Sequence, residues 1–131
     1  PREGAWPIGV ADPRQRNRSV LHVEMTTGSL STSAGSERDL VVSGERVGHV
    51  LDPRTGRPAT FDGSVTVWHQ RGIAADALST ALYVMGPEEG LRWAETRGIA
   101  ACYLIPEQGT LRVEMTRAFR RLLPSAATGR A

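Results

Sequence analysis

Lysine is absent from this 131-residue chain, and all 16 of its basic residues are arginines. The 14 acidic residues leave a formal net charge of only +2 at neutral pH. The arginines are scattered along the chain, and Arg117, Arg120 and Arg121 are expected to form a solvated helix face. Because the net charge is so small, nothing in the composition calls for nucleic acid or an anionic membrane, and we expect no nucleic acid partner.

Cysteine occurs once, at Cys102, so no disulfide can form within the chain. Cys102 lies in the apolar run Ile99–Ile105 and is expected to be a buried thiol. No apolar run reaches the roughly 18 residues that a membrane-spanning helix needs. Hydrophobic residues make up 40% of the chain and charged residues 23%, which is ordinary for one globular domain.

Alternating and apolar segments predict strands, and two segments predict helices. Ile73–Met85 is rich in Ala and Leu, and Gly86 after it suits a helix C-terminus. Pro87 suits the first turn of a second helix that ends near Gly98. Strands are expected at Trp6–Ala11, Val20–Met25, Leu40–Val47 (a hairpin), Ser64–His69, Ile99–Ile105 and Thr110–Met115, and a short helix at Ala118–Leu123. We predict an α+β fold, a mostly antiparallel sheet with a helix pair packed on one face.

Asp76 and Thr80 stand four residues apart on the first predicted helix. This spacing places both side chains on one face, with Cβ atoms about 5–6 Å apart. Two such oxygens can bind Mg²⁺, which prefers oxygen ligands and keeps waters or substrate phosphates in its other positions. The spacing alone also allows a structural alternative, and pairs of this kind are common on helices. Asp76 would then be a first-turn acid favoured by the helix dipole, and Thr80 would bond back to the carbonyl of Asp76.

His49 precedes a segment whose residues favour a tight turn. In Asp52–Gly56, proline presets φ, the aspartate can accept a backbone hydrogen bond two residues on, and Gly56 allows a positive φ. The segment is therefore a purely structural turn, or a turn that holds His49 and the backbone around Val50 against a ligand. In the second case His49 is a plausible base.

The small, polar segment Thr32–Gly35 also allows two interpretations. Its hydroxyls and amides can bind a phosphate, or it can be a loop that enters the next strand. The chain contains no Walker loop, CxxC, HExxH or GxSxG pattern.

Taken together, the order of these segments resembles the FAD:protein FMN transferase family, the ApbE-type flavin transferases. The resemblance rests on His49–Pro58 and on the helix segment Ala75–Ala81, and the opening Trp6–Pro13 is also similar to the family. It extends to about Leu123. Members of this family cleave FAD and transfer its FMN moiety to a Thr or Ser hydroxyl of a target protein, and they need Mg²⁺.

The resemblance implies roles for individual residues. Asp76 and Thr80 would be ligands of the metal, and His49 would be the base that activates the acceptor hydroxyl. Asp52 would brace the loop that carries His49, and Val50 would line the flavin site. The residues implied to contact the flavin substrate are Thr32, Ser33, His49, Val50, Asp52 and Thr55.

The chain also departs from the family, whose members are usually much longer. The family's Thr-Ser-Gly-acidic-Tyr stretch appears here as Thr32–Ser36, without the tyrosine. We expect residues 1–123 to form the C-terminal part of an ApbE-like transferase domain and residues 124–131 to form a flexible tail. The expected partners are FAD, an acceptor protein such as a redox-complex subunit, and a missing N-terminal half or second chain. Alone, this chain is expected not to transfer FMN.

Other functions remain open at this point. A non-catalytic FAD-binding module would bind FAD without modifying an acceptor. An FAD pyrophosphatase would use water in place of the acceptor hydroxyl and would release FMN and AMP. An interaction domain would self-associate or expose a large apolar patch. The resemblance indicates the periplasmic side of a bacterial cell envelope as the location.

Overall fold

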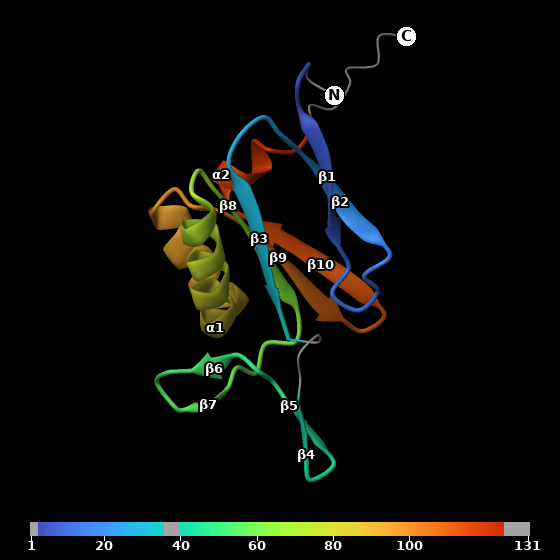
Figure 1. The fold of residues 1–131 in the computed structure, drawn as a ribbon, viewed down its shortest axis with the longest axis vertical. Helices are drawn as coiled ribbons and strands as arrows, with labels where there is room; N and C mark the ends of the chain where they lie inside the picture. Colours follow the sequence, from blue (N-terminus) through green and yellow to red (C-terminus); the bar gives the residue numbers. More distant parts are fainter. Residues whose placement is uncertain (1–2, 36–39, 125–131) are drawn as a thin grey trace.

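The computed structural model describes residues 3–35 and 40–124. Its centre is a four-stranded antiparallel sheet in the order β10-β9-β8-β3 (Figure 1). The strands are β3 (Ser29–Ala34), β8 (Ser64–His69), β9 (Ala100–Glu107) and β10 (Thr110–Met115). β3 and β10 are therefore the edge strands of this sheet.

The two faces of the sheet are covered by different elements. Helix α1 (Gly72–Thr96) packs along one face, mainly over β3 and β8. The other face is covered by the antiparallel pair β1 (Trp6–Ala11) and β2 (Ser19–Met25), together with the short helix α2 (Arg117–Arg120). These layers confirm the predicted α+β class with a mostly antiparallel sheet.

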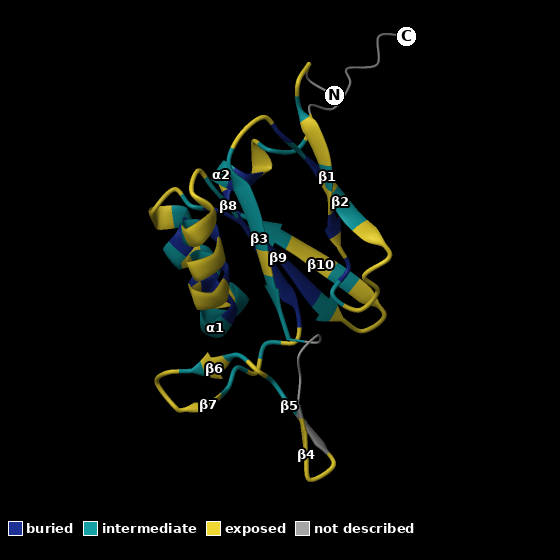
Figure 2. Ribbon diagram, viewed as in Figure 1, coloured by how far each residue is buried: buried dark blue, intermediate teal, exposed yellow. Residues whose placement is uncertain are grey.

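Strand β9 supplies side chains to both layers of the core, because successive residues of a strand point to opposite faces. Ala101, Tyr103 and Ile105 pack beneath α1. Cys102 and Leu104 pack against the β1–β2 side, and burial raises the pKa of the Cys102 thiol to about 12. Cys102 is thus a buried, neutral thiol, as expected. Figure 2 shows the buried residues concentrated at the centre of the sheet.

The helix pair predicted on either side of Gly86 is confirmed as two segments of α1. Gly86 interrupts the helix with φ 76° and ψ 171°, and Pro87 follows it. Beside the break, the carbonyl of Leu82 accepts a hydrogen bond from outside the helix. The Tyr103 hydroxyl donates to that carbonyl at 2.7 Å. Gly90 leaves room for the tyrosine, because a Cβ there would collide with its hydroxyl.

Strand β3 corrects one expectation, the loop that the sequence allows at Thr32–Gly35. Thr32 to Ala34 belong to β3, which pairs with β8 from Ser29 to Ala34, and Gly35 follows the strand. Its small polar side chains hide the alternation that normally identifies a strand. Ser31 and Ser33 face α1, whereas the Thr32 hydroxyl points to the other side and lies 2.8 Å from that of Thr66.

Two short hairpins project from one end of the sheet (Figure 1). One is formed by β4 (Leu40–Val42) and β5 (Glu45–Val47), with the predicted turn at residues 43–44. The other is formed by β6 (Leu51–Asp52) and β7 (Arg57–Pro58). The segment between the two hairpins carries His49 back to the end of β3.

Two remaining expectations concern the ends of the chain and its helices. Of the tail expected at 124–131, residues 125–131 lie outside the described part, and Pro124 is exposed. Among the described residues, no helix is long and apolar enough to span a bilayer.

Candidate active site

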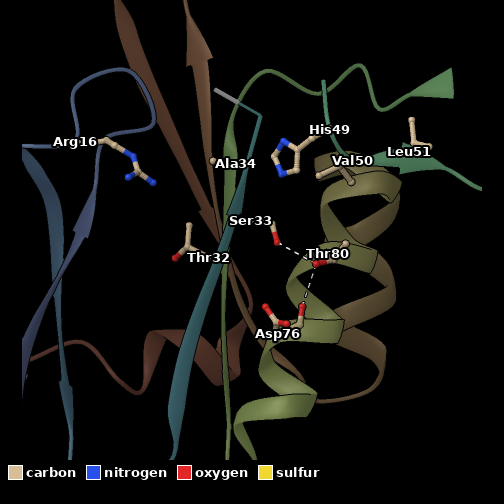
Figure 3. A pocket seen from close by; sticks show the side chains of 9 residues that line it. All are labelled: Arg16, Thr32, Ser33, Ala34, His49, Val50, Leu51, Asp76 and Thr80. Carbon is tan, nitrogen blue, oxygen red and sulfur yellow. Dashed lines mark hydrogen bonds between the residues drawn. The ribbon is translucent and has the colours of Figure 1, made fainter. Parts of the chain in front are cut away.

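A cavity of about 520 Å³ lies beside the edge strand β3. Figure 3 shows that side chains from β3, from α1, from the loop between β1 and β2 and from the segment that leads into β6 surround it. The lining residues are Arg16, Thr32, Ser33, Ala34, His49, Val50, Leu51, Asp76 and Thr80. The cavity thus brings together six of the residues singled out from the sequence, although they are widely separated along the chain.

Asp76 and Thr80 lie on the face of α1 that borders β3, and both are exposed to the cavity. Asp76 is the fifth residue of the helix, so the idea of a first-turn acid is wrong. The other half of the structural alternative is confirmed, because the Thr80 hydroxyl donates to the Asp76 carbonyl at 3.2 Å. That bond leaves the lone pairs of the Thr80 oxygen able to bind a cation.

Strand β3 adds hydroxyl groups to this helix face. Ser31 donates to a carboxylate oxygen of Asp76 at 3.2 Å. The hydroxyl of Ser33 lies 3.3 Å from that of Thr80 and 2.9 Å from that of Ser79. Residues 31 and 33 both face α1 because they are two apart on a strand. The result is a row of oxygen atoms between β3 and α1.

This oxygen set fits Mg²⁺ in character. Mg²⁺ is bound by oxygen ligands, commonly one or two carboxylates, and keeps waters and substrate phosphates in the remaining positions. Asp76 supplies one carboxylate, and Thr80 and Ser33 supply neutral oxygens beside it. Within residues 3–35 and 40–124, no three His, Cys, Asp or Glu side chains are grouped as in a site built from protein ligands alone. The cluster therefore suits a metal that the substrate helps to hold.

His49 lies across the cavity from this row, with its ring directed toward Ser33 and Thr80 (Figure 3). The segment that carries it is fixed by its neighbour Val50, whose carbonyl accepts the Ala59 amide at 2.8 Å and whose side chain packs on the core. The following chain is tied to α1, because the Tyr83 hydroxyl donates to the Phe61 carbonyl at 2.5 Å. An exposed imidazole is thus held next to the oxygen row.

Asp52 and Thr55 do not line the cavity. The Asp52 carboxylate accepts the Arg54 amide at 2.8 Å and binds the Arg54 guanidinium through both of its oxygens. This hydrogen bonding holds the pKa of Asp52 below its ordinary range. Thr55 accepts the Arg57 amide at 3.2 Å. The structure therefore shows the structural Asx turn, which braces the β6–β7 hairpin just after His49.

Three lining residues were not singled out from the sequence. Ala34 and Leu51 carry no chemical signal and are found only through their neighbours in space. Arg16 does have a local signal in the sequence. It follows the tripeptide Asp12–Arg14, which repeats the Asp-Pro-Arg sequence of Asp52–Arg54 and marks a second rigid turn.

The fold and the cavity together define a class of domain. It is an α+β layer whose edge strand carries oxygen donors suited to a divalent cation, with a histidine opposite them. The ApbE family model matches residues 1–104 of this chain. The chain belongs to the ApbE family.

Individual relatives agree with this assignment. The chain is 31% identical over 122 residues to the FAD:protein FMN transferase of Escherichia coli strain K12. The aligned region covers 92% of this chain and 35% of that protein. It is 36% identical over 107 residues to the protein of the same name from Rhodobacter capsulatus, covering 81% of this chain and 20% of the relative. The chain thus spans about a third or less of these relatives.

Solved structures show the same fold. The ApbE protein of Thermotoga maritima superposes with a TM-score of 0.79 at 31% identity and covers 92% of this chain and 39% of that one. The flavinyl transferase ApbE of Pseudomonas stutzeri, in its apo form, gives 0.73 at 35% identity and covers 94% and 38%. The helices and the mostly antiparallel strands of this chain are therefore those of an ApbE domain.

Proposed function

We propose that this chain carries the metal-and-base part of the active site of an FAD:protein FMN transferase. The observation that carries the proposal is the cavity at β3, which places the carboxylate of Asp76, the hydroxyl of Thr80 and the imidazole of His49 around one space. Membership of the ApbE family and the names of the relatives support the same activity.

Asp76 and Thr80, with Ser33 beside them, would hold Mg²⁺. The metal would offset negative charge on the phosphate oxygens of FAD. Thr32 and Ser33 would offer hydroxyls to the phosphates, and Val50 would contact the flavin. Asp52 and Thr55 would act from outside the cavity, by holding the hairpin that follows His49.

In the proposed reaction, a Thr or Ser hydroxyl of the acceptor attacks the FMN-side phosphorus of FAD. Since such a hydroxyl is a weak nucleophile at neutral pH, a base is needed. His49 takes the hydroxyl proton while the new oxygen–phosphorus bond forms. The bond from that phosphorus to the bridging oxygen breaks, and AMP leaves. The acceptor keeps FMN through a phosphoester.

We further propose that the rest of the transferase packs on surfaces that this chain leaves open. Trp6 is 72% exposed on β1, and Val41 is 69% exposed on the β4–β5 hairpin. Leu51, which lines the cavity, is 57% exposed. These side chains lie on three different elements, and a partner that covered them would bury their apolar surface. The partner would be the remaining part of an ApbE domain, as an N-terminal half or on a second chain. The acceptor would be a redox-complex subunit at the bacterial cell envelope, on its periplasmic side.

The test replaces the matching part of the P. stutzeri transferase with this chain. The chimera is incubated with FAD, Mg²⁺ and an acceptor domain that the parent enzyme modifies, and the intact mass of the acceptor is measured. We expect a gain of one FMN unit, and no gain from the 131-residue chain by itself.

Three results would count against the proposal. A folded chimera that binds FAD but leaves the acceptor mass unchanged would favour a binding module. Release of FMN and AMP without modification of the acceptor would favour a pyrophosphatase. Transfer by the chain alone would contradict the proposal that it holds only part of the site.

A further inference from the structure

The loop between β1 and β2 is a compact turn that holds one arginine at the cavity. Asp12 is 4% exposed, and its carboxylate accepts the Arg14 amide at 2.8 Å. The Asp12 amide donates to the Arg18 carbonyl at 2.8 Å, which closes the loop. Arg16 lies between these closing bonds, and its side chain reaches the cavity lining.

A second contact fixes the loop to the sheet. The Arg14 guanidinium donates to the carbonyl of Glu107 on β9 at 3.3 Å. The arginines of this loop therefore differ in role, since Arg14 anchors the loop and Arg16 lines the cavity. Arg18 contributes its backbone to the loop closure and does not line the cavity.

The cavity wraps around β3 and has a different charge on each side. Figure 3 shows Arg16 and Thr32 on one side of the strand and His49, Thr80 and Asp76 on the other. Arg16 is the one arginine, and Asp76 the one carboxylate, among the described residues that line it. A ligand that crosses the strand edge would meet the base and the metal ligands first and the guanidinium beyond them.

We infer that Arg16 binds the AMP-side phosphate of FAD and stabilises AMP as it leaves. This inference rests on the proposed function. The diphosphate of FAD carries two negative charges, and Asp76 adds a third. A bound Mg²⁺ offsets two of them, and the guanidinium of Arg16 offsets the one that remains. Arginine suits this position because its fixed charge and planar donors match phosphate.

The proposed reaction also develops negative charge on the leaving AMP, on the side of the cavity where Arg16 lies. As the acceptor oxygen bonds to the FMN-side phosphorus, the bridging oxygen keeps the electron pair of the broken bond and leaves with AMP. The proton of the hydroxyl goes to His49, so the phosphates together gain one negative charge. In an in-line displacement the leaving group lies opposite the nucleophile. With the nucleophile near His49, the new charge develops toward Arg16.

The test is calorimetric titration of the 131-residue chain with FAD, AMP or FMN in the presence of Mg²⁺. Arg16→Gln is compared with Arg18→Gln, a matched change on the same loop. We expect Arg16→Gln to weaken the binding of FAD and AMP about tenfold, as for the loss of a charged hydrogen bond, and to leave FMN binding unchanged. Arg16→Lys should restore part of the loss, and Arg18→Gln should have little effect.

Equal affinity of Arg16→Gln and the unchanged chain for FAD would overturn the inference, as would an equal loss in Arg18→Gln. If the chain alone binds no FAD, the titration is repeated in the chimera, where the same outcomes apply. The transfer assay separates the two proposals. If the chimera transfers FMN and Arg16→Gln binds FAD as tightly as the unchanged protein, only this inference is rejected. If Arg16→Gln weakens the binding of FAD and the chimera transfers no FMN, the transferase is rejected and only the binding of the AMP-side phosphate by Arg16 stands.

Discussion

Helix α1 and the β6–β7 hairpin each carry an acidic residue followed by a hydroxyl residue, and they use the pair differently. Asp76 and Thr80 lie on the helix face that borders β3 and line the cavity. Asp52 binds Arg54, Thr55 accepts a backbone amide, and neither lines the cavity. The difference teaches that a pair of this kind has no role of its own. Whether the acidic and hydroxyl side chains line a site or stabilise a turn depends on the groups that face them.

The physical cause is the size of each element. A two-residue hairpin arm has no long neighbour, so its polar groups find partners within the turn. A helix packed along a sheet meets the neighbouring strand over several turns, so its polar groups share a boundary with side chains from elsewhere in the sequence. The oxygen row between α1 and β3 is such a boundary.

Asp76→Asn in the chimera tests this comparison between the helix and the hairpin most strongly, since it should have the largest effect on the transfer rate. The amide oxygen can still accept from Ser31, so the helix should fold. Loss of the carboxylate should lower the transfer rate by about 100-fold or more, because the metal loses its one charged protein ligand. Transfer is measured against Mg²⁺ concentration, with circular dichroism as the control for folding. An unchanged Mg²⁺ dependence would show that the carboxylate holds no metal.

The next largest effect is expected for His49→Ala, which leaves the oxygen row intact. Removal of a general base should slow transfer about 100-fold, with little change in FAD affinity. His22→Ala is the matched control, since His22 is exposed on β2 and lies outside the cavity lining. The rate of each variant is followed as a function of pH. Equal rates for the two variants would remove His49 from the mechanism.

A smaller effect is expected for Asp52→Asn in the hairpin. The asparagine oxygen can still accept the Arg54 amide, and only the exposed ion pair is lost. Exposed pairs contribute little, so transfer should fall less than about tenfold, and the Mg²⁺ concentration that gives half the maximal rate should stay the same. A shift in that Mg²⁺ concentration as large as the shift in Asp76→Asn would place Asp52 in the metal site.

The smallest effect is the response of the hairpin to acid. Because hydrogen bonds from Arg54 lower the pKa of Asp52, the stabilisation is full above the unfolded carboxyl pKa of about 4. It is lost as the pH falls through the lower folded value. Amide hydrogen exchange of residues 51–58 should therefore quicken, relative to α1, only below about pH 4. If the exchange rates of Asp52→Asn show the same pH dependence, the loss of protection comes from a titrating group other than Asp52.

Much of the fold could be predicted from the sequence, because local signals were strong. The break at Gly86 and Pro87 follows from backbone chemistry alone, and the apolar run at β9 indicates a buried strand wherever it packs. β3 was less clear, because its serines and threonine lack the apolar alternation of a half-buried strand. Only pairing with β8 identifies it.

The candidate site divides in the same way. The spacing of Asp76 and Thr80 fixed their common helix face, because helix geometry depends on local sequence. Which strand that face meets, whether His49 stands across from it, and whether Arg16 reaches the same cavity were decided by the tertiary structure. Those contacts join segments far apart in the sequence, and they depend on how the layers pack around β3, which no local pattern records.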